Sequence, residues 1–101
     1  METISKWTKA TGIPQKVKTA VWERDNHKCI VCGSIYASPC CHIVRRSKGG
    51  KGIEENIVTL CGEHHTALDA YDKNIEFAVR EYIKSKYPDW EEEKMIYRRL
   101  I

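Results

Sequence analysis

Apolar residues recur at helical spacing in four stretches of the chain. Pro14 suits the start of the first stretch, and Asn74 is a candidate cap for the third, which Pro88 ends. In the fourth, Asp89 is a candidate cap, acidic residues follow it, and two arginines stand in the last turn. The pattern predicts helices over residues 15–25, 62–72, 74–87 and 89–100.

Two short apolar segments, joined by a glycine-rich basic loop, have the pattern of strands. They are CCHIV, residues 40–44, and IVTL, residues 57–60. Two strands among several helices predict an α+β fold. Residues 1–13 show no periodicity and are expected to form a flexible arm, which leaves residues 14–101 as a single domain.

Composition suggests that this domain needs more than an apolar core. A chain of 101 residues buries too little surface to be more than marginally stable. Five cysteines, an odd number, do not suit a closed disulfide framework. The N-terminus has no apolar signal segment, and no run of about 18 apolar residues could span a membrane. We therefore expect a cytoplasmic protein whose cysteines bind metal.

Charge is unevenly distributed along the chain. Residues 1–51 carry ten Lys and Arg against three Asp and Glu, a net +7, whereas residues 52–101 carry seven against eleven, a net −4. A basic half suggests a face for a polyanion such as a nucleic acid. The alternative interpretation of the same charge difference is that both halves form ordinary solvated surfaces of mixed charge.

Two pairs of metal-ligand residues have the spacing of a zinc site. Cys29 and Cys32 form one pair, and Cys61 and His64 form the other, each separated by two residues. Two such pairs close a tetrahedron, and three cysteines with one histidine are a common structural set for Zn²⁺. A redox-active thiol pair and buried apolar cysteines are the alternatives, and neither explains the repeated spacing.

A second histidine follows directly and points elsewhere on a helix. His65 is rotated by about 100° from His64. Asp69 lies four residues further on, so it shares a face with His65. The two side chains could hold a second ion, although an ordinary surface pair on a helix has the same pattern.

The arrangement of these motifs resembles a known family. The segment ERDNHKCIVCG, followed by CHIVRRSKGGKGIEENIVTLCGEHH, is similar to HNH endonucleases over residues 17 to about 72, and most similar to small HNH proteins of tailed phages. The family's His, Asn and His match His42, Asn56 and His65. The resemblance implies a zinc-stabilised ββα-metal core, over residues 29–72, with flanking helices at both ends.

The resemblance also implies roles for these residues. His42 matches the general base, Asn56 a residue that fixes the loop around it, and His65 a ligand of a catalytic divalent ion, which is Mg²⁺, Mn²⁺, Ni²⁺ or Zn²⁺. Asp69 falls where the family places another ligand. Cys41 stands where the family often has a metal-binding Asp or His. Whether Cys41 binds the ion or packs as a small apolar residue is left open, as is a zinc set in which Cys40 or Cys41 replaces His64.

The basic loop is expected to contact DNA phosphates, which gives affinity without sequence selectivity. Its candidate residues are Arg45, Arg46, Lys48 and Lys51. The expected function is therefore a metal-dependent DNA endonuclease. The phage resemblance implies terminase or other packaging proteins as partners, no membrane association, and the cytoplasm of a bacterial host. The alternative is a noncatalytic zinc module that binds DNA or a protein partner.

Overall fold

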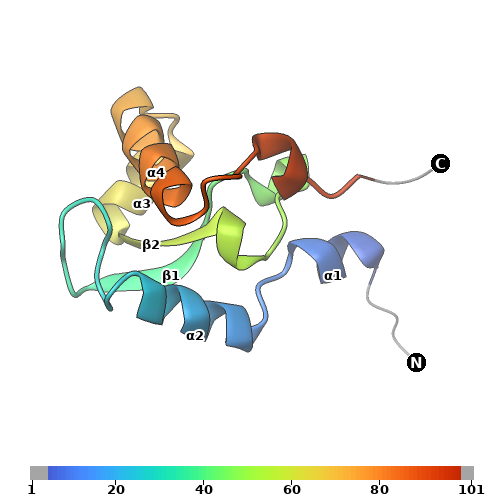
Figure 1. Cartoon of the computed structure of the whole chain (residues 1–101), viewed down its shortest axis with the longest axis horizontal. Helices are drawn as coiled ribbons and strands as arrows, with labels where there is room; N and C mark the ends of the chain where they lie inside the picture. Colours follow the sequence, from blue (N-terminus) through green and yellow to red (C-terminus); the bar gives the residue numbers. More distant parts are fainter. Residues whose placement is uncertain (1–4, 99–101) are drawn as a thin grey trace.

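A computed structural model describes residues 5–98, which form a small α+β structure around one two-stranded antiparallel sheet (Figure 1). The α+β class predicted from the sequence is thus confirmed. No helix among residues 5–98 has the length and apolar character needed to cross a membrane. In chain order the elements are α1 (Lys6–Thr11), α2 (Gln15–Arg24), β1 (Ala37–His42), η1 (Arg46–Lys48), η2 (Glu54–Asn56), β2 (Ile57–Cys61), α3 (Gly62–Asp69), α4 (Lys73–Lys86) and η3 (Glu92–Met95).

The hairpin of β1 and β2 contains a bulge. Ser38 pairs with Leu60, whereas Cys41 pairs with Val58, so β1 has one more residue than β2 between these two pairs. A bulge of this kind bends the strand and redirects the side chains that follow it. The strand predicted over residues 40–44 lies too late in the chain. The observed strand β1 covers residues 37–42 and ends at the candidate base His42.

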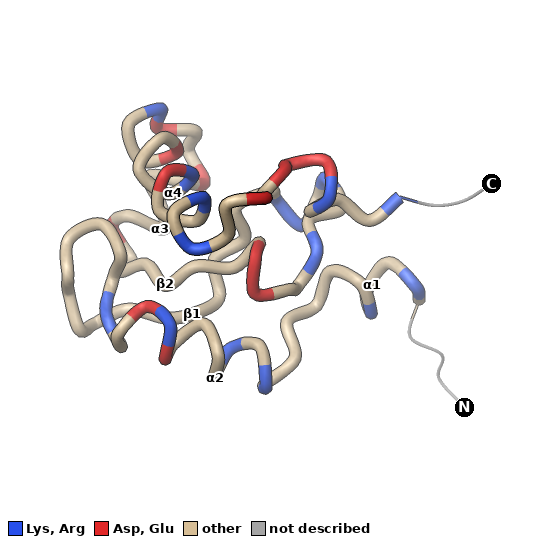
Figure 2. The backbone as a smooth tube through the Cα atoms, in the orientation of Figure 1, with Lys and Arg blue, Asp and Glu red and all other residues tan. Residues whose placement is uncertain are grey.

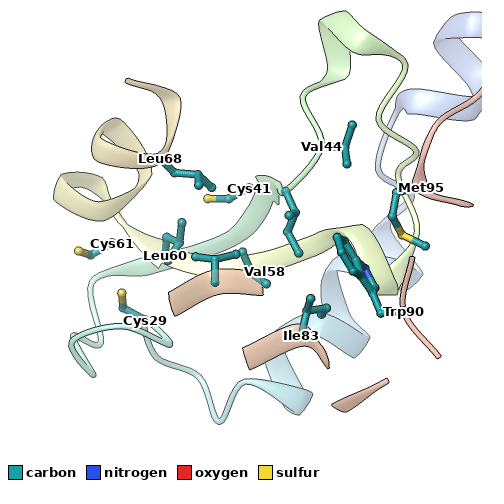
Figure 3. Close-up of a cluster of buried hydrophobic side chains, with 12 residues drawn as sticks. Cys29, Cys41, Val44, Val58, Leu60, Cys61, Leu68, Ile83, Trp90 and Met95 are labelled. Carbon is teal, nitrogen blue, oxygen red and sulfur yellow. The ribbon is translucent and has the colours of Figure 1, made fainter. Parts of the chain in front are cut away.

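The core is built around β2, in which every residue from Ile57 to Cys61 is buried. Such a run is typical of a strand that is covered on both faces. Val79 and Ile83 of α4 and Val21 of α2 are fully buried with it. Figure 3 shows part of this cluster, with Trp90 and Met95 at one end and Cys29 and Cys61 toward the other.

A buried ion pair connects α2 to the rest of the core. The Arg24 guanidinium donates to the Asp25 carboxylate at 2.8 Å and to the backbone oxygens of residues 54 and 57 at 2.7 Å. Asp25 in turn accepts from the Thr59 amide at 2.9 Å and from the Tyr82 hydroxyl at 2.6 Å. Because both charges have several partners, burial does not leave either of them unpaired.

The prediction of a flexible N-terminal arm is wrong for residues 6–11, because these residues form α1. Ser5 caps this helix by accepting from the Thr8 amide, and Thr11 at its end is fully buried. The Gly52 amide donates to the Ala10 carbonyl at 3.0 Å, and a Cβ at Gly52 would overlap the Gly12 backbone. The glycine therefore permits α1 to dock on the loop that follows β1. Residues 1–4 of the predicted arm lie outside the described residues.

The predicted last helix is also wrong, because residues 89–98 contain only the short turn η3. Trp90 is buried and donates its indole N–H to the Glu55 carbonyl at 2.7 Å. Beyond η3 the chain extends, and Ile96 forms a β-bridge with Gly50. These tertiary contacts override the local helical pattern. The Asn74 cap was misplaced as well, since Asp72 caps α4.

The two charge signs are not separated onto two faces. Figure 2 shows the acidic residues of η2 and η3 close to the basic loop after β1. The loop and η3 are hydrogen bonded, with the Lys51 amide donating to the Met95 carbonyl at 2.8 Å. The charge difference between the two halves of the chain therefore does not by itself define a nucleic-acid face.

Candidate functional site

Four predicted metal ligands converge in the structure. The ligand atoms of Cys29, Cys32, Cys61 and His64 all lie within 4.8 Å of one another. The Sγ atoms of Cys32 and Cys61 are 3.8 Å apart, and His64 Nδ1 lies 3.3 Å from Cys61 Sγ and 3.6 Å from Cys29 Sγ. In a tetrahedral zinc site the sulfurs are separated by about 3.8 Å and sulfur and nitrogen by about 3.6 Å. The cluster can therefore hold a metal ion such as zinc.

The surroundings of Cys29 in this cluster suit a thiolate ligand. Burial raises the pKa of Cys29, but hydrogen bonds from the backbone of residues 31, 32 and 61 and from the His64 side chain outweigh it and lower this pKa to about 6. Cys29 and Cys61 are buried while Cys32 is exposed, so the cluster lies at the surface of the core. Gly33, with φ 78°, adopts a left-handed turn after Cys32 that glycine allows without strain.

Helix α3 carries a second group of polar side chains away from the cluster. His65 Nε2 lies 3.5 Å from Asp69 Oδ2, as expected for residues one turn apart on a helix. Both side chains are partly exposed. His64 therefore belongs to the cysteine cluster, whereas His65 lies outside it and pairs with Asp69.

An open hollow joins this pair to the end of β1. Its volume is about 290 Å³. Its lining combines nitrogen, sulfur and carboxylate groups with two guanidinium groups, a set that could bind both an ion and a phosphate. The lining residues are Cys40, His42, Arg45, Arg46, Ser47, His65 and Asp69.

His42 is anchored in this hollow by the N-terminal helix. Its Nε2 lies 2.9 Å from the Thr11 carbonyl oxygen. A carbonyl only accepts, so Nε2 carries the proton and donates it, and Nδ1 of the neutral ring remains a free proton acceptor. Burial lowers the pKa of His42, the bond to Thr11 offsets part of this, and the nearby Arg46 and His65 lower it further. A neutral imidazole of this kind can act as a base.

Cys41 does not face the hollow. It is 1% exposed and packs in the apolar cluster that also contains Leu68 and Val58 (Figure 3). Burial raises the pKa of its thiol to about 12. Side chains alternate between the two faces of a strand, and here Cys40 and His42 line the hollow while Cys41 points into the core. The tentative assignment of Cys41 to the second ion is therefore wrong.

Asn56 is buried in the loop beside this site, with 0% exposure. Its Oδ1 accepts from the Val44 amide at 2.9 Å, and its Nδ2 donates to the carbonyls of Val44 at 3.2 Å and Lys51 at 2.9 Å. These are the cross-loop hydrogen bonds that the resemblance implied. They hold the chain that follows His42 in one conformation.

The four basic candidates separate in space. Arg45 and Arg46 line the hollow, but Arg45 donates to the Leu68 and Asp69 carbonyls at the end of α3, and Arg46 donates to the Thr11 hydroxyl at 3.0 Å. Lys48 lines the neighbouring depression, which shares Arg45 with the hollow. Lys51 lines a different depression that contains Trp90 and Met95. Lys51 is therefore not placed with the other three.

Two residues of the hollow and its surroundings, Thr11 and Ser47, were not predicted from the sequence. The Thr11 carbonyl and hydroxyl reach His42 and Arg46, and Ser47 lines the hollow. Neither residue belongs to a recognisable motif, so only the docking of α1 and the loop conformation could have revealed them.

Comparisons with known proteins give no relative of this chain. No protein-family model matches it, and neither a curated protein nor a solved structure does. The functions of the cysteine cluster and of the hollow are therefore inferred from their own chemistry.

Proposed function

We propose that this protein is a metal-dependent DNA endonuclease of the HNH type. The observation that carries the proposal is the position of His42, whose Nε2–H is fixed by a backbone carbonyl and which shares a hollow with the His65–Asp69 pair. An imidazole that is held neutral beside two metal-ligand groups is what metal-assisted hydrolysis requires. The order of motifs over residues 17 to about 72, which resembles that of HNH endonucleases, suggests the same function.

The hydrolytic step divides among a few residues. His42 accepts a proton from the attacking water through Nδ1, while the Thr11 carbonyl keeps the ring oriented. His65 and Asp69 would hold a divalent cation, and the chemistry that it would supply is neutralisation of the charge that develops on the phosphate. Asn56 fixes the loop that carries His42 and Arg45, so its contribution is to geometry.

The cysteine cluster has a separate, structural role in this proposal. Its four side chains would hold Zn²⁺ as a complete set of protein ligands, with no position left for substrate. The cluster connects the turn after α2, through Cys29 and Cys32, to the start of α3 at Cys61 and His64. Since α3 also carries His65, these four residues would fix the helix that presents the ligands of the catalytic ion.

Nicking of a supercoiled plasmid tests the proposal. Purified protein is assayed with Mg²⁺, Mn²⁺, Ni²⁺ and Zn²⁺, beside His42→Ala and His27→Ala. His27 is an exposed histidine that pairs with Glu23 and lies outside the hollow, so it is the matched control. Loss of the base should lower the rate about 10²–10⁴-fold, whereas His27→Ala should cut like the parent. No cleavage with any of these metals, or equal cleavage by His42→Ala, would contradict the proposal.

A noncatalytic zinc module that binds DNA is the second candidate. It is favoured by the small number of metal ligands in the hollow. Among residues 5–98, three or more candidate ligands converge at one place, and that place is the cluster of Cys29, Cys32, Cys61 and His64. His65 and Asp69 offer an ion only two ligands. Binding of DNA without cleavage under every metal condition would support this candidate.

A further inference from the structure

Tyr71 adopts a backbone conformation that is unusual for a bulky residue. It lies in the turn between α3 and α4 with φ 62°, in the left-handed region. Its amide donates to the Leu68 carbonyl at 3.1 Å, so it closes the end of α3 at the position where glycine or asparagine is preferred. A tyrosine there strains the backbone. Strain that is retained at an exposed position calls for a compensating role of the side chain.

The ring of Tyr71 is exposed and lies beside two basic side chains. The residue is 54% exposed. The guanidinium carbon of Arg45 lies 3.8 Å from the ring centroid, and the Lys48 ammonium lies 5.8 Å from it. Arg45 is itself anchored by the Leu68 and Asp69 carbonyls, so the aromatic ring and the cation are held together. The wider depression also carries Arg80 and three carboxylates, those of Asp69, Glu76 and Glu92, so the two cations beside the ring are a local feature of a surface of mixed charge.

This aromatic and basic surface adjoins the candidate active site. The depression that Tyr71 lines shares His42, Arg45 and Asp69 with the hollow described above. A nucleic-acid strand whose phosphate lies in the hollow would bring its neighbouring nucleotide to this surface. Exposed aromatic rings beside a basic groove are the usual means of binding single-stranded nucleic acid, because every base presents a face for stacking.

We propose that Tyr71 stacks on an unpaired base next to the scissile phosphate, so that the site prefers single-stranded or locally opened DNA to regular duplex. This inference rests on the proposed nuclease function and adds a substrate class to it. In a regular duplex the base faces are stacked on each other and are not available to the ring, whereas the phosphates are equally available in both forms. Arg45 and Lys48 would then supply the backbone contacts, and Tyr71 the selectivity for unpaired bases.

The test measures binding without cleavage. The His42→Ala protein is titrated with a single-stranded oligonucleotide and with its duplex, alone and with Tyr71→Gly or Tyr71→Phe added. Glycine adopts φ 62° without strain, so Tyr71→Gly should remain folded, which circular dichroism checks. The matched control is Tyr36→Gly, because Tyr36 is 84% exposed and lines neither the hollow nor the depression beside it.

Tyr71→Gly should weaken single-strand binding roughly 5- to 150-fold, as the loss of one stacked base predicts. Duplex affinity should change less than about threefold, and Tyr71→Phe and Tyr36→Gly should bind like the parent. Equal losses for both DNA forms would mean that the ring only orients Arg45, and no loss for either would remove Tyr71 from the interface. Both results overturn this inference while parent cleavage stands, whereas a parent that neither binds nor cuts DNA refutes the nuclease proposal itself.

Discussion

His42 and Thr11 are joined by a hydrogen bond of 2.9 Å between an imidazole nitrogen and a backbone carbonyl, although 31 residues separate them in the chain. The bond makes α1 part of the hollow that contains His42. It also fixes which ring nitrogen is protonated, and thus which one can accept a proton from water.

The first prediction concerns pH. Burial, with Arg46 and His65 nearby, lowers the pKa of His42 below the ordinary histidine value of 6.5. The neutral ring is the active form, so the acidic limb of kcat/KM should have its midpoint below pH 6.5. The same shift means that the unfolded state takes up the proton first, so His42 costs stability as pH falls below about 6.5.

A pH–rate profile for nicking, recorded from about pH 5 to 8, measures the acidic limb. His42→Ala should lose that limb, while His27→Ala should keep it. A limb centred above 6.5 would contradict the assignment of His42 as a buried base.

The second prediction is that zinc is needed for folding. Structural zinc contributes roughly 10–16 kcal/mol in small modules, about as much as or more than the stability of a whole domain. Cys29→Ser and Cys61→Ser should therefore give unfolded or insoluble protein. Cys40→Ser should retain about one zinc per chain, because Cys40 lies outside the cluster. Elemental analysis measures the metal, and soluble, folded protein without zinc would contradict the prediction.

The third prediction separates the two adjacent cysteines. Cys41→Asp should strongly destabilise the protein, since it places a carboxylate at a position that is 1% exposed. Cys40→Asp should remain folded and raise cleavage with Mg²⁺ or Mn²⁺ relative to Zn²⁺, because it adds an oxygen ligand to the hollow. Thermal melts and plasmid nicking measure the two effects. The opposite pattern would return Cys41 to the site.

The fourth prediction concerns phosphate contacts. Arg46→Ala should weaken binding to all sequences alike and reduce the slope of log affinity against log salt by up to about 0.9. Lys51→Ala should leave the slope unchanged, because Lys51 lines a different depression. Fluorescence anisotropy at several salt concentrations measures both slopes. Equal slopes for parent and Arg46→Ala would place DNA elsewhere on the surface.

The fifth prediction addresses stability away from the site. Asp25→Ala removes the carboxylate that pairs with the largely buried Arg24 guanidinium and accepts from the Thr59 amide and the Tyr82 hydroxyl, and it should cost about 3–5 kcal/mol. Glu23→Ala, at a neighbouring side chain that is 66% exposed, should cost less than about 1 kcal/mol. Urea denaturation measures both changes, and similar midpoints for the two variants would contradict the role of the pair.

The elements that the sequence predicted well are those in which local pattern and tertiary environment agree. β2 is a short β-branched segment that is buried throughout, and α4 has an apolar stripe that faces the core at Val79 and Ile83. The metal cluster was predictable because ligand spacing is itself a local signal, so Cys29 and Cys61 could be assigned without knowing the fold.

The errors lie where long-range contacts decide. A six-residue helix such as α1 is unstable alone and forms because the buried Thr11 and the Gly52 backbone hold it. Residues 89–98 have a helical pattern, but the hydrogen bond from the Trp90 indole to the Glu55 carbonyl holds them in a conformation that is mostly not helical. The bulge in β1 leaves no mark on hydrophobic periodicity, so the start and register of this strand could not be predicted.

The extra residue in β1 has a consequence for redesign of this protein. It divides the hairpin into two half-ladders, one in which Ala37 and Ser38 pair with the Cys61 end of β2 and one in which Cys41 and His42 pair with the Ile57 end. The bulge sets the register of the two halves separately, because residues before and after it pair with β2 in different alignments. Deleting one residue between Ser38 and Cys41 would therefore change which face of β1 the cysteine and histidine side chains occupy, so a redesigned hairpin has to keep the extra residue.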